Sequence, residues 1–250
     1  MLIISSSAKT LDFETPYAAK AATASPVFLE DAEKIQSVLK DMDLQVLKNL
    51  LKVNEKLAIL NFERMQTWEP SGGRPAIFAY KGDVFRQLTP SEYSEEESEY
   101  AKQSLYVMSG LYGPVGAYDV IQPYRLEMAA KVSGVSRGGA MSDFWREKIT
   151  EHFNTLIERD GHTVLLDLAS KEYSAAVDFE KLNCPVVKVD FKEHKNGKLK
   201  IMGIFSKRAR GMMIDYCIRH RVTSAEEIKK FNGGGYEFHE EEDGRYVFVR

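Results

Sequence analysis

The chain has 250 residues, of which 44% are hydrophobic and 28% are charged, with 17 Gly and 8 Pro. These values exclude collagen-like, disordered and disulfide-scaffold proteins. The formal net charge is -3, so the average composition does not point to a nucleic-acid partner. The chain has two cysteines and lacks both a signal peptide and an apolar run of about 18 residues, which predicts a cytoplasmic protein without a membrane span.

The first part of the chain is predicted to contain one buried strand and a helical unit. Residues 2–5 form a short apolar run that ends in polar residues, as expected of a buried strand. Between residues 29 and 68 the apolar positions recur with helical spacing in successive sets, and Asp43 is placed to cap the second helix. We therefore expect a helical hairpin or a three-helix unit over this subregion.

Strand-like and helical segments alternate in the middle of the sequence. Residues 76–80 and 105–110 are strand-like, and an acidic helix is expected to begin near Ser94. Residues 110–125 are rich in the turn-forming residues Gly and Pro. Residues 142–159 have the pattern of a helix that is capped by its first residue.

A hairpin signal dominates the last third of the chain. Residues 163–168 form another apolar run that predicts a strand. Asn196-Gly197 lies between the strand-like residues 185–191 and 199–205, and this dipeptide favours a tight β-turn. Residues 207–221 are then expected to be helical.

The order of these elements defines the expected fold class. Strands and helices interleave, which predicts an α/β or α+β fold with a mixed sheet. A final hairpin is expected around Asp243-Gly244. We expect a single domain over residues 1–250, with a helical subregion at about 29–68 and a basic hairpin and helix at about 185–221.

Motifs of the common cofactor enzymes are absent from the sequence. The glycines at 110, 113 and 116 have the wrong spacing for a dinucleotide fingerprint. No phosphate-binding loop or nucleophile elbow occurs. The five histidines and two cysteines lack the spacing of metal ligands. We therefore expect no cofactor and no metal site.

Charged side chains recur where the predicted strands end. They are Lys9, Lys81, Asp83, Arg125 and Glu127. Sites in α/β proteins form outside the carboxyl ends of strands, so these side chains are candidates for one polar pocket, and for catalytic roles within it. The alternative is a set of separate solvated loops with local ion pairs. The sequence leaves both interpretations open.

A short basic stretch stands out from the mildly acidic average. Residues 188–210 hold eight basic and two acidic side chains, a formal charge of +6, so that the rest of the chain carries -9. The basic side chains predicted to bind DNA are Lys192, Lys195, Lys198, Lys200, Lys207, Arg208 and Arg210. A two-stranded basic ribbon that leads into a helix N-terminus suits a polyphosphate backbone. A solvated hairpin face is the alternative.

Six ordered segments together resemble the YaaA family of bacterial peroxide-stress proteins. They are residues 7–12 (Ser-Ala-Lys-Thr-Leu-Asp), 81–85 (Lys-Gly-Asp-Val-Phe), 109–113 (Ser-Gly-Leu-Tyr-Gly), 122–128 (Gln-Pro-Tyr-Arg-Leu-Glu-Met), 168–173 (Leu-Ala-Ser-Lys-Glu-Tyr) and 207–211 (Lys-Arg-Ala-Arg-Gly). The resemblance covers essentially the whole chain. Ser7 is a departure, because the family usually has proline at this position.

The resemblance implies a cytoplasmic protein that limits damage by hydrogen peroxide and is linked to lower free intracellular iron. It implies a fold of unusual topology, a positively charged cleft and a helix-hairpin-helix element that binds DNA. That element would fall within residues 29–68, where the usual hairpin glycine is missing at both Met42-Asp43 and Val53-Asn54. Packing alone is an equal explanation of these helices.

The resemblance and the charge pattern together lead to a functional hypothesis. Lys207, Arg208 and Arg210 would hold phosphates of duplex or branched DNA, in a manner directed by structure rather than by base sequence. Lys9, Lys81 and Arg125 would line the same cleft.

Two alternative functions remain open. One is an enzyme that uses a lysine and carboxylate pocket to process a nucleic-acid base or a nucleotide. The other is direct sequestration of iron by the acidic run at residues 240–243.

Overall fold

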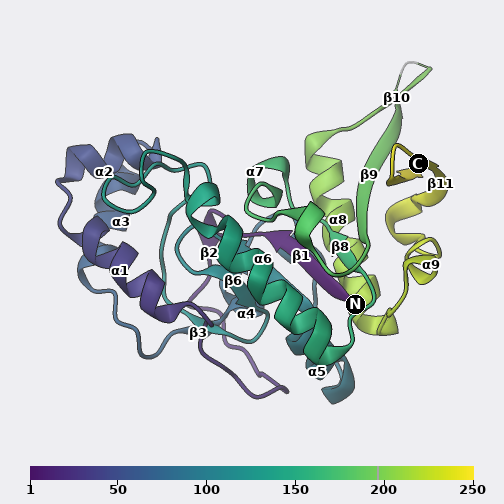
Figure 1. The fold of residues 1–250 in the computed structure, drawn as a ribbon, viewed down its shortest axis with the longest axis horizontal. Coiled ribbons are helices and arrows are strands. Elements are labelled where there is room, and N and C mark those ends of the chain that lie inside the picture. Colours follow the sequence, from purple (N-terminus) through teal and green to yellow (C-terminus); the bar gives the residue numbers. More distant parts are fainter. Residues whose placement is uncertain (196) are drawn as a thin grey trace.

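The chain is arranged around one mixed sheet, and the computed structural model describes residues 1–195 and 197–250 (Figure 1). The described strands are β1 (Leu2–Ser6), β2 (Thr10–Leu11), β3 (Arg74–Pro75), β4 (Tyr80–Lys81), β5 (Leu105–Ser109), β6 (Gly113–Gly116), β7 (Val120–Ile121), β8 (Leu165–Asp167), β9 (Val186–Lys195), β10 (Lys198–Lys200), β11 (Glu237–Glu242) and β12 (Arg245–Val249). The described α-helices are α1 (Leu29–Lys40), α2 (Leu44–Leu51), α3 (Glu55–Gln66), α4 (Ala76–Ala79), α5 (Glu95–Ser104), α6 (Met141–Asp160), α7 (Lys171–Ser174), α8 (Gly203–His220) and α9 (Ala225–Ile228). Short 3-10 turns are η1 (Phe85–Gln87), η2 (Phe179–Lys181) and η3 (Gly233–Gly235).

The main sheet has a parallel centre and antiparallel edges. Its strand order is β11-β12-β9-β8-β1-β5-β6, and β10 pairs only with β9. β5, β1, β8, β9 and β12 are parallel, whereas β6 and β11 each run antiparallel to their neighbour. In chain order the parallel strands follow the 2-1-3-4-5 arrangement of doubly wound folds. The predicted α/β class with a mixed sheet is confirmed.

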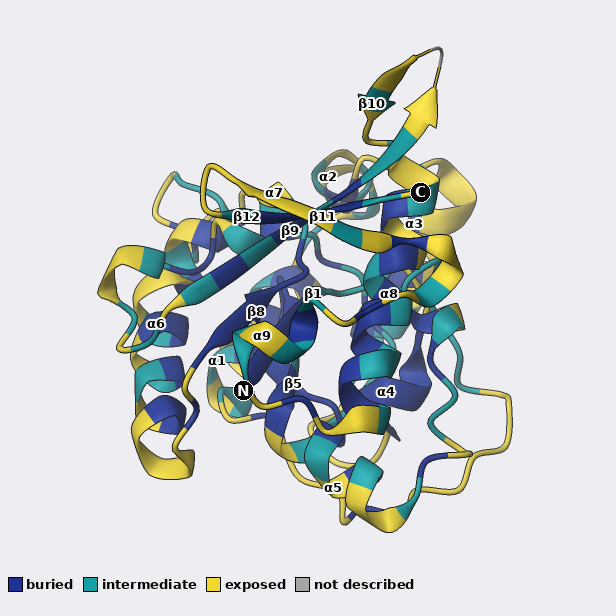
Figure 2. Cartoon of the chain, turned by 90° about the vertical axis from the view of Figure 1, so that its right-hand side faces the viewer, coloured by how far each residue is buried: buried dark blue, intermediate teal, exposed yellow. Residues whose placement is uncertain are grey.

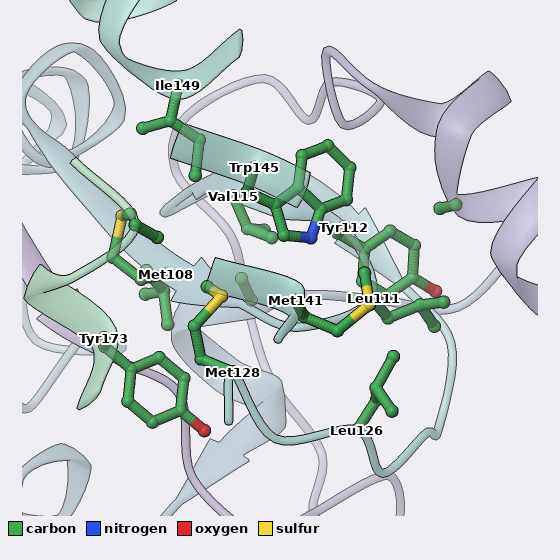
Figure 3. Packing of buried hydrophobic residues seen from close by; sticks show 14 of the residues in the cluster. Met108, Leu111, Tyr112, Val115, Leu126, Met128, Met141, Trp145, Ile149 and Tyr173 are labelled. Carbon is green, nitrogen blue, oxygen red and sulfur yellow. The ribbon is translucent and has the colours of Figure 1, made fainter. Parts of the chain in front are cut away.

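Both faces of the sheet are covered by helices, which explains the apolar run at the start of the chain. Successive side chains of a strand point to opposite faces. Leu2 and Ile4 accordingly pack into the core beneath α6, whereas Ile3 packs with α5 and α8 on the other side. The central strands are buried between these layers (Figure 2). Figure 3 shows Trp145 of α6 packed beside Tyr112 in the first of these cores.

Residues 29–68 form the predicted three-helix unit, which lies at one end of the molecule (Figure 1). Leu47 and Met65 are buried in the core, so packing accounts for the inner face of these helices. Asn54 caps α3 by accepting a hydrogen bond from the N–H of Leu57 at 3.0 Å. Asp43 stands at the N-cap of α2 but makes no capping hydrogen bond through its side chain. Lys52 adopts a left-handed conformation, with φ of 51°, where a glycine is commonly found.

Two predictions for the middle of the chain are wrong. Residues 76–79 form the single helical turn α4, and only Tyr80–Lys81 is extended. The N–H of Ala76 donates to the carbonyl oxygen of Asp119 at 2.9 Å, so tertiary hydrogen bonds satisfy the free end of this turn. The helix expected over residues 142–159 is present as α6, but Ser142 is not its N-cap: the helix begins at Met141, and the carboxylate of Asp143 accepts from the N–H of Ala140 at 2.9 Å. The turn-rich residues 110–125 also contain β6 and β7.

The predicted second arm of the basic hairpin is too long. The strand ends at Lys200, and α8 begins at Gly203, because the N–H of Ser206 already donates to the carbonyl oxygen of Met202 at 2.8 Å. Lys207 therefore lies in the second turn of α8 and not at a helix N-terminus. Gly197 has the positive φ of 70° expected of a turn, while Asn196 lies outside the described residues. Within the described ranges, none of the helices combines the length and apolar character that a membrane span requires.

A close contact holds α8 against the turn at residues 82–87. A Cβ atom at Gly211 would overlap the carbonyl oxygen of Val84 and lie 2.9 Å from Cβ of Gln87. The helix can approach the turn this closely only because residue 211 has no side chain. Gly203, in the first turn of the same helix, has open space around the position of a Cβ atom.

We therefore expect Gly211→Ala to destabilise the protein by about 1–3 kcal/mol through overpacking. The matched change Gly203→Ala should be neutral or stabilising by up to about 1 kcal/mol, because alanine is the better helix former. The free energy of unfolding in urea measures both effects. Equal stabilities of the two variants would contradict the proposed contact.

Candidate functional site

A cleft of about 450 Å³ opens at the carboxyl ends of β1 and β8. The chain passes from β1 to β5 on one side and later returns to β8 on the other, so the cleft lies where the strand order reverses. Ligands of doubly wound folds bind at this point. Its walls are the loop after β1, the turn after β4, the loop after β8 and one face of α8. The lining residues are Ser6, Ser7, Ala8, Lys9, Thr10, Lys81, Gly82, Asp83, Val84, Phe85, Leu168, Ser170, Glu172, Tyr173, Lys207 and Arg210.

Lys9 joins the cleft to Arg125 and Glu127, two of the predicted site residues. The carboxylate of Glu127 lies 3.1 Å from Nζ of Lys9 and 3.1 Å from the guanidinium of Arg125. Arg125 is the more buried cation, since 13% of its side chain is exposed against 63% for Lys9. Gly110 makes this arrangement possible, because a Cβ atom there would lie 2.5 Å from the carbonyl oxygen of Leu126.

Lys81 is held by an acid that the sequence reasoning did not single out. Nζ of Lys81 lies 2.8 Å from a carboxylate oxygen of Asp12, and Thr10 pairs with Lys81 between β2 and β4. The hydrogen bond from Lys81, together with those from Thr15, holds the pKa of Asp12 well below its ordinary value. Asp12 lies within the first family-like segment, which was the available signal. The other predicted acid, Asp83, lines the cleft directly.

Arg210 lines the cleft, and the carboxylate of Asp167, at the end of β8, lies near it. A guanidinium nitrogen of Arg210 donates to the carbonyl oxygen of Ala169 at 3.1 Å. Burial lowers the pKa of Arg210, and the neighbouring carboxylate of Asp167 opposes that change. Burial likewise raises the pKa of Asp167, which accepts hydrogen bonds from the hydroxyl of Ser174 at 2.9 Å and the N–H of Ala169 at 3.0 Å. Nε of Arg210 is buried without a hydrogen-bond partner among the described residues.

Hydroxyl groups line the remaining wall, and sequence reasoning missed them because serine is common in loops. The N–H of Ser170 donates to the hydroxyl of Ser6 at 2.9 Å, which ties the loops after β8 and β1 together. The hydroxyl of Ser7 donates to that of Tyr173 at 3.3 Å. The N–H of Ser7 also donates to the carbonyl oxygen of Met108 at 3.0 Å, a bond that proline could not make. Serine at this position thus adds two anchors to the loop.

The predicted DNA-binding residues divide into three groups. Lys207 and Arg210 line the cleft, and Arg208 lies beside it on α8. Lys195, Lys198 and Lys200 belong to the β9–β10 hairpin, which projects from the body of the molecule and is largely exposed (Figure 2).

Lys192, the remaining residue of this set, is neutralised by Glu242 of β11 at 2.6 Å. Two acids of β9 are also paired, Asp190 with Arg245 at 3.1 Å and Glu193 with Arg250 at 3.0 Å. Ion pairs with the last part of the chain therefore neutralise one basic and two acidic side chains of β9.

The acidic run at residues 240–243 does not form a compact ligand set. Glu240, Glu241 and Glu242 follow one another along β11, so neighbours point to opposite faces. Across residues 1–195 and 197–250, no group of three or more His, Cys, Asp or Glu side chains is arranged to hold a metal ion.

The geometry defines a class: a doubly wound α/β protein with a cationic cleft at its switch point. Residues 1–242 match the family model described as peroxide stress protein YaaA, and the chain belongs to this family. It is 40% identical over 238 residues to a UPF0246 protein of Crocosphaera subtropica, covering 95% of this chain and 94% of that relative. It is 38% identical to a UPF0246 protein of Rickettsia bellii over the full length of both chains. A UPF0246 protein of Aliivibrio fischeri is 39% identical over all of this chain and 97% of its own.

The hydroxyl of Ser174 offers a test of the buried carboxylate behind the cleft. Burial makes the pKa of Asp167 higher in the folded protein than the ordinary 3.8, so its contribution to stability falls as the pH rises from 3.8 through the folded pKa. Ser174→Ala removes a donor to the charged form, and we expect a loss of about 1.5–3 kcal/mol near pH 7. The loss should shrink as the pH falls from 7 toward 4, because a growing fraction of this carboxyl group, whose pKa is raised, is protonated. Urea unfolding at both pH values measures it, and a pH-independent loss would contradict this role.

Proposed function

We propose that this protein serves the peroxide-stress response in the cytoplasm by binding DNA through its cationic cleft. The observation that supports this proposal best is the position of Lys207 and Arg210, which lie in the switch-point cleft on the helix that follows the exposed basic hairpin. Four basic and two acidic side chains line the cleft. Lys9 and Lys81 each pair with a carboxylate just outside this lining, so Lys207 and Arg210 are the lining cations that form no salt bridge among the described residues. Phosphate contacts of this kind give affinity without reading the base sequence.

The lower free iron that the resemblance implies is proposed as a consequence of this role rather than of direct iron storage. Glu242, within the acidic run, is already engaged by Lys192. Purified protein titrated with Fe(II) in a calorimeter should show no binding heat, and saturable binding would favour sequestration instead.

The α2–α3 hairpin is a second proposed DNA contact, by virtue of its short connection at residues 52–54.

The DNA proposal predicts a specific loss in a cleft variant. Replacing Lys9 and Lys207 together by Gln removes two cations from the wall while keeping side chains of similar length. We expect weaker binding to duplex DNA and a salt dependence, the slope of log K against log salt, that is shallower by about 1.8. Fluorescence anisotropy over a salt series gives both quantities.

The matched control is Lys102→Gln with Arg159→Gln. Lys102 precedes β5 and Arg159 precedes β8, so both lie toward the amino ends of the parallel strands, away from the cleft. This control removes the same charge and should leave the slope almost unchanged. Equal slopes for the cleft variant and the native protein would overturn the assignment.

An enzyme acting on a nucleic-acid base or a nucleotide is the second candidate, because the cleft occupies the usual place of an α/β active site. Its lysines, Lys9 and Lys81, lie near the carboxylates Glu127, Asp12 and Asp83. Borohydride reduction in the presence of lesion-containing DNA traps a Schiff base as a covalent adduct. On the binding proposal we expect no adduct in mass spectrometry, and an adduct that disappears with Lys9→Gln or Lys81→Gln would establish the enzyme instead.

A further inference from the structure

A second depression lies beside the cleft and shares Asp83 with it. It encloses about 280 Å³. Three arginines line it, from three distant parts of the chain: Arg86, Arg208 and Arg250. The sequence reasoning singled out only Arg208 among them. With Asp83 as its one acid, this depression also has a net positive wall.

The three arginines differ in how they are held. Arg250 is fixed, since it donates to Glu193 at 3.0 Å and lies over the rings of Phe205 and Tyr236. Arg86 and Arg208 are exposed, and within residues 1–195 and 197–250 neither forms a salt bridge. Two guanidinium groups are therefore available to a ligand. Guanidinium groups recognise phosphate oxygens through paired hydrogen bonds.

The turn at residues 82–87 separates the two depressions. Lys207 and Arg208 are consecutive on α8, so they point about 100° apart, the first into the cleft and the second into the neighbouring depression. Asp83 stands between them and lines both. The close contact of Gly211 with Val84 fixes the turn on the helix. The spacing of the two cationic sites is thus built into the fold.

We propose that one DNA strand crosses this turn, with one phosphate in the cleft and a neighbouring phosphate held by Arg86 and Arg208. The carboxylate of Asp83, on the turn between the two sites, repels phosphate, so the DNA backbone straddles this turn in a fixed register. This inference rests on the proposed DNA binding and specifies how many phosphates are held and by which residues. It distinguishes a strand with linked phosphates from a single phosphate group.

Short ligands test the inference directly. The dinucleotide pTpT carries two phosphates joined through a sugar, thymidine 5′-monophosphate carries one, and inorganic pyrophosphate lacks the sugar between its phosphates. Arg86→Gln with Arg208→Gln should weaken pTpT binding about tenfold. It should leave the affinities for thymidine monophosphate and pyrophosphate nearly unchanged, because a ligand that cannot span both sites still binds in the cleft. Lys9→Gln with Lys207→Gln should weaken all three. Isothermal calorimetry or NMR titration at low salt measures these affinities.

The outcomes separate this inference from the DNA proposal itself. If the cleft variant weakens every ligand while the Arg86 and Arg208 variant weakens none, DNA binding stands and the two-site inference is overturned. An equal loss for the mononucleotide and the dinucleotide in the arginine variant overturns it as well. If instead the cleft variant binds long DNA as tightly as the native protein does, both proposals fail.

Asp83, on the turn between the two sites, gives a second test that does not depend on the arginine variant. Asp83→Asn removes the negative charge and keeps the size of the side chain. We expect pTpT to bind about threefold more tightly, because the repulsion between carboxylate and backbone is lost. Unchanged or weaker binding of pTpT would overturn the straddling register.

Discussion

The cleft depends on the position of β1 at the centre of the parallel strands. β1 is hydrogen-bonded to β5 on one side and to β8 on the other, with Ile3 opposite Leu105 and Leu2 opposite Leu165. The connection after β1 enters β5 through α5 on one face of the sheet, whereas α7, which follows β8, packs on the other face. A crevice between them is the geometric result, and the polar residues at these strand ends become its walls.

The walls of the cleft come from distant parts of the sequence. Close contacts at two glycines, where a side chain would not fit, bring them together. Gly110 lets the backbone of residues 126–127 lie against the end of β5, which places Glu127 beside Lys9. Gly211 lets α8 lie against the turn that carries Asp83. Glycine is required at these two positions because another part of the chain lies too close for a Cβ atom, and not because the backbone angles are unusual. Five of the six family-like segments contribute side chains to the cleft or to an ion pair at its rim, and the sixth supplies Gly110.

Sequence reasoning predicted the elements whose periodicity decides their structure, and failed where distant contacts decide it. The helices at 29–68, the helix after Ser94 and the sheet class followed from local patterns. Residues 76–79 read as a strand, yet they form a turn because the loop at 117–119 satisfies its free N–H groups. Strand-end reasoning led to Lys9, Lys81 and Asp83, but it did not lead to Arg86, which lies beyond the strand end and reaches the second depression only through the packing of its turn beside α8.

Local pairing also changes the meaning of the charge pattern. The stretch at residues 188–210 is strongly basic in sequence, but the last hairpin of the chain packs its own charges against β9 and engages Lys192. The basic side chains that remain available are those at the tip of the β9–β10 hairpin and on α8. Because binding to a polyanion releases counterions in proportion to the phosphates contacted, this smaller set, together with Lys9 and Arg86, would define the salt dependence of the proposed binding. A protein with a net charge of -3 can thus hold a phosphate backbone at one place while the rest of its surface repels it.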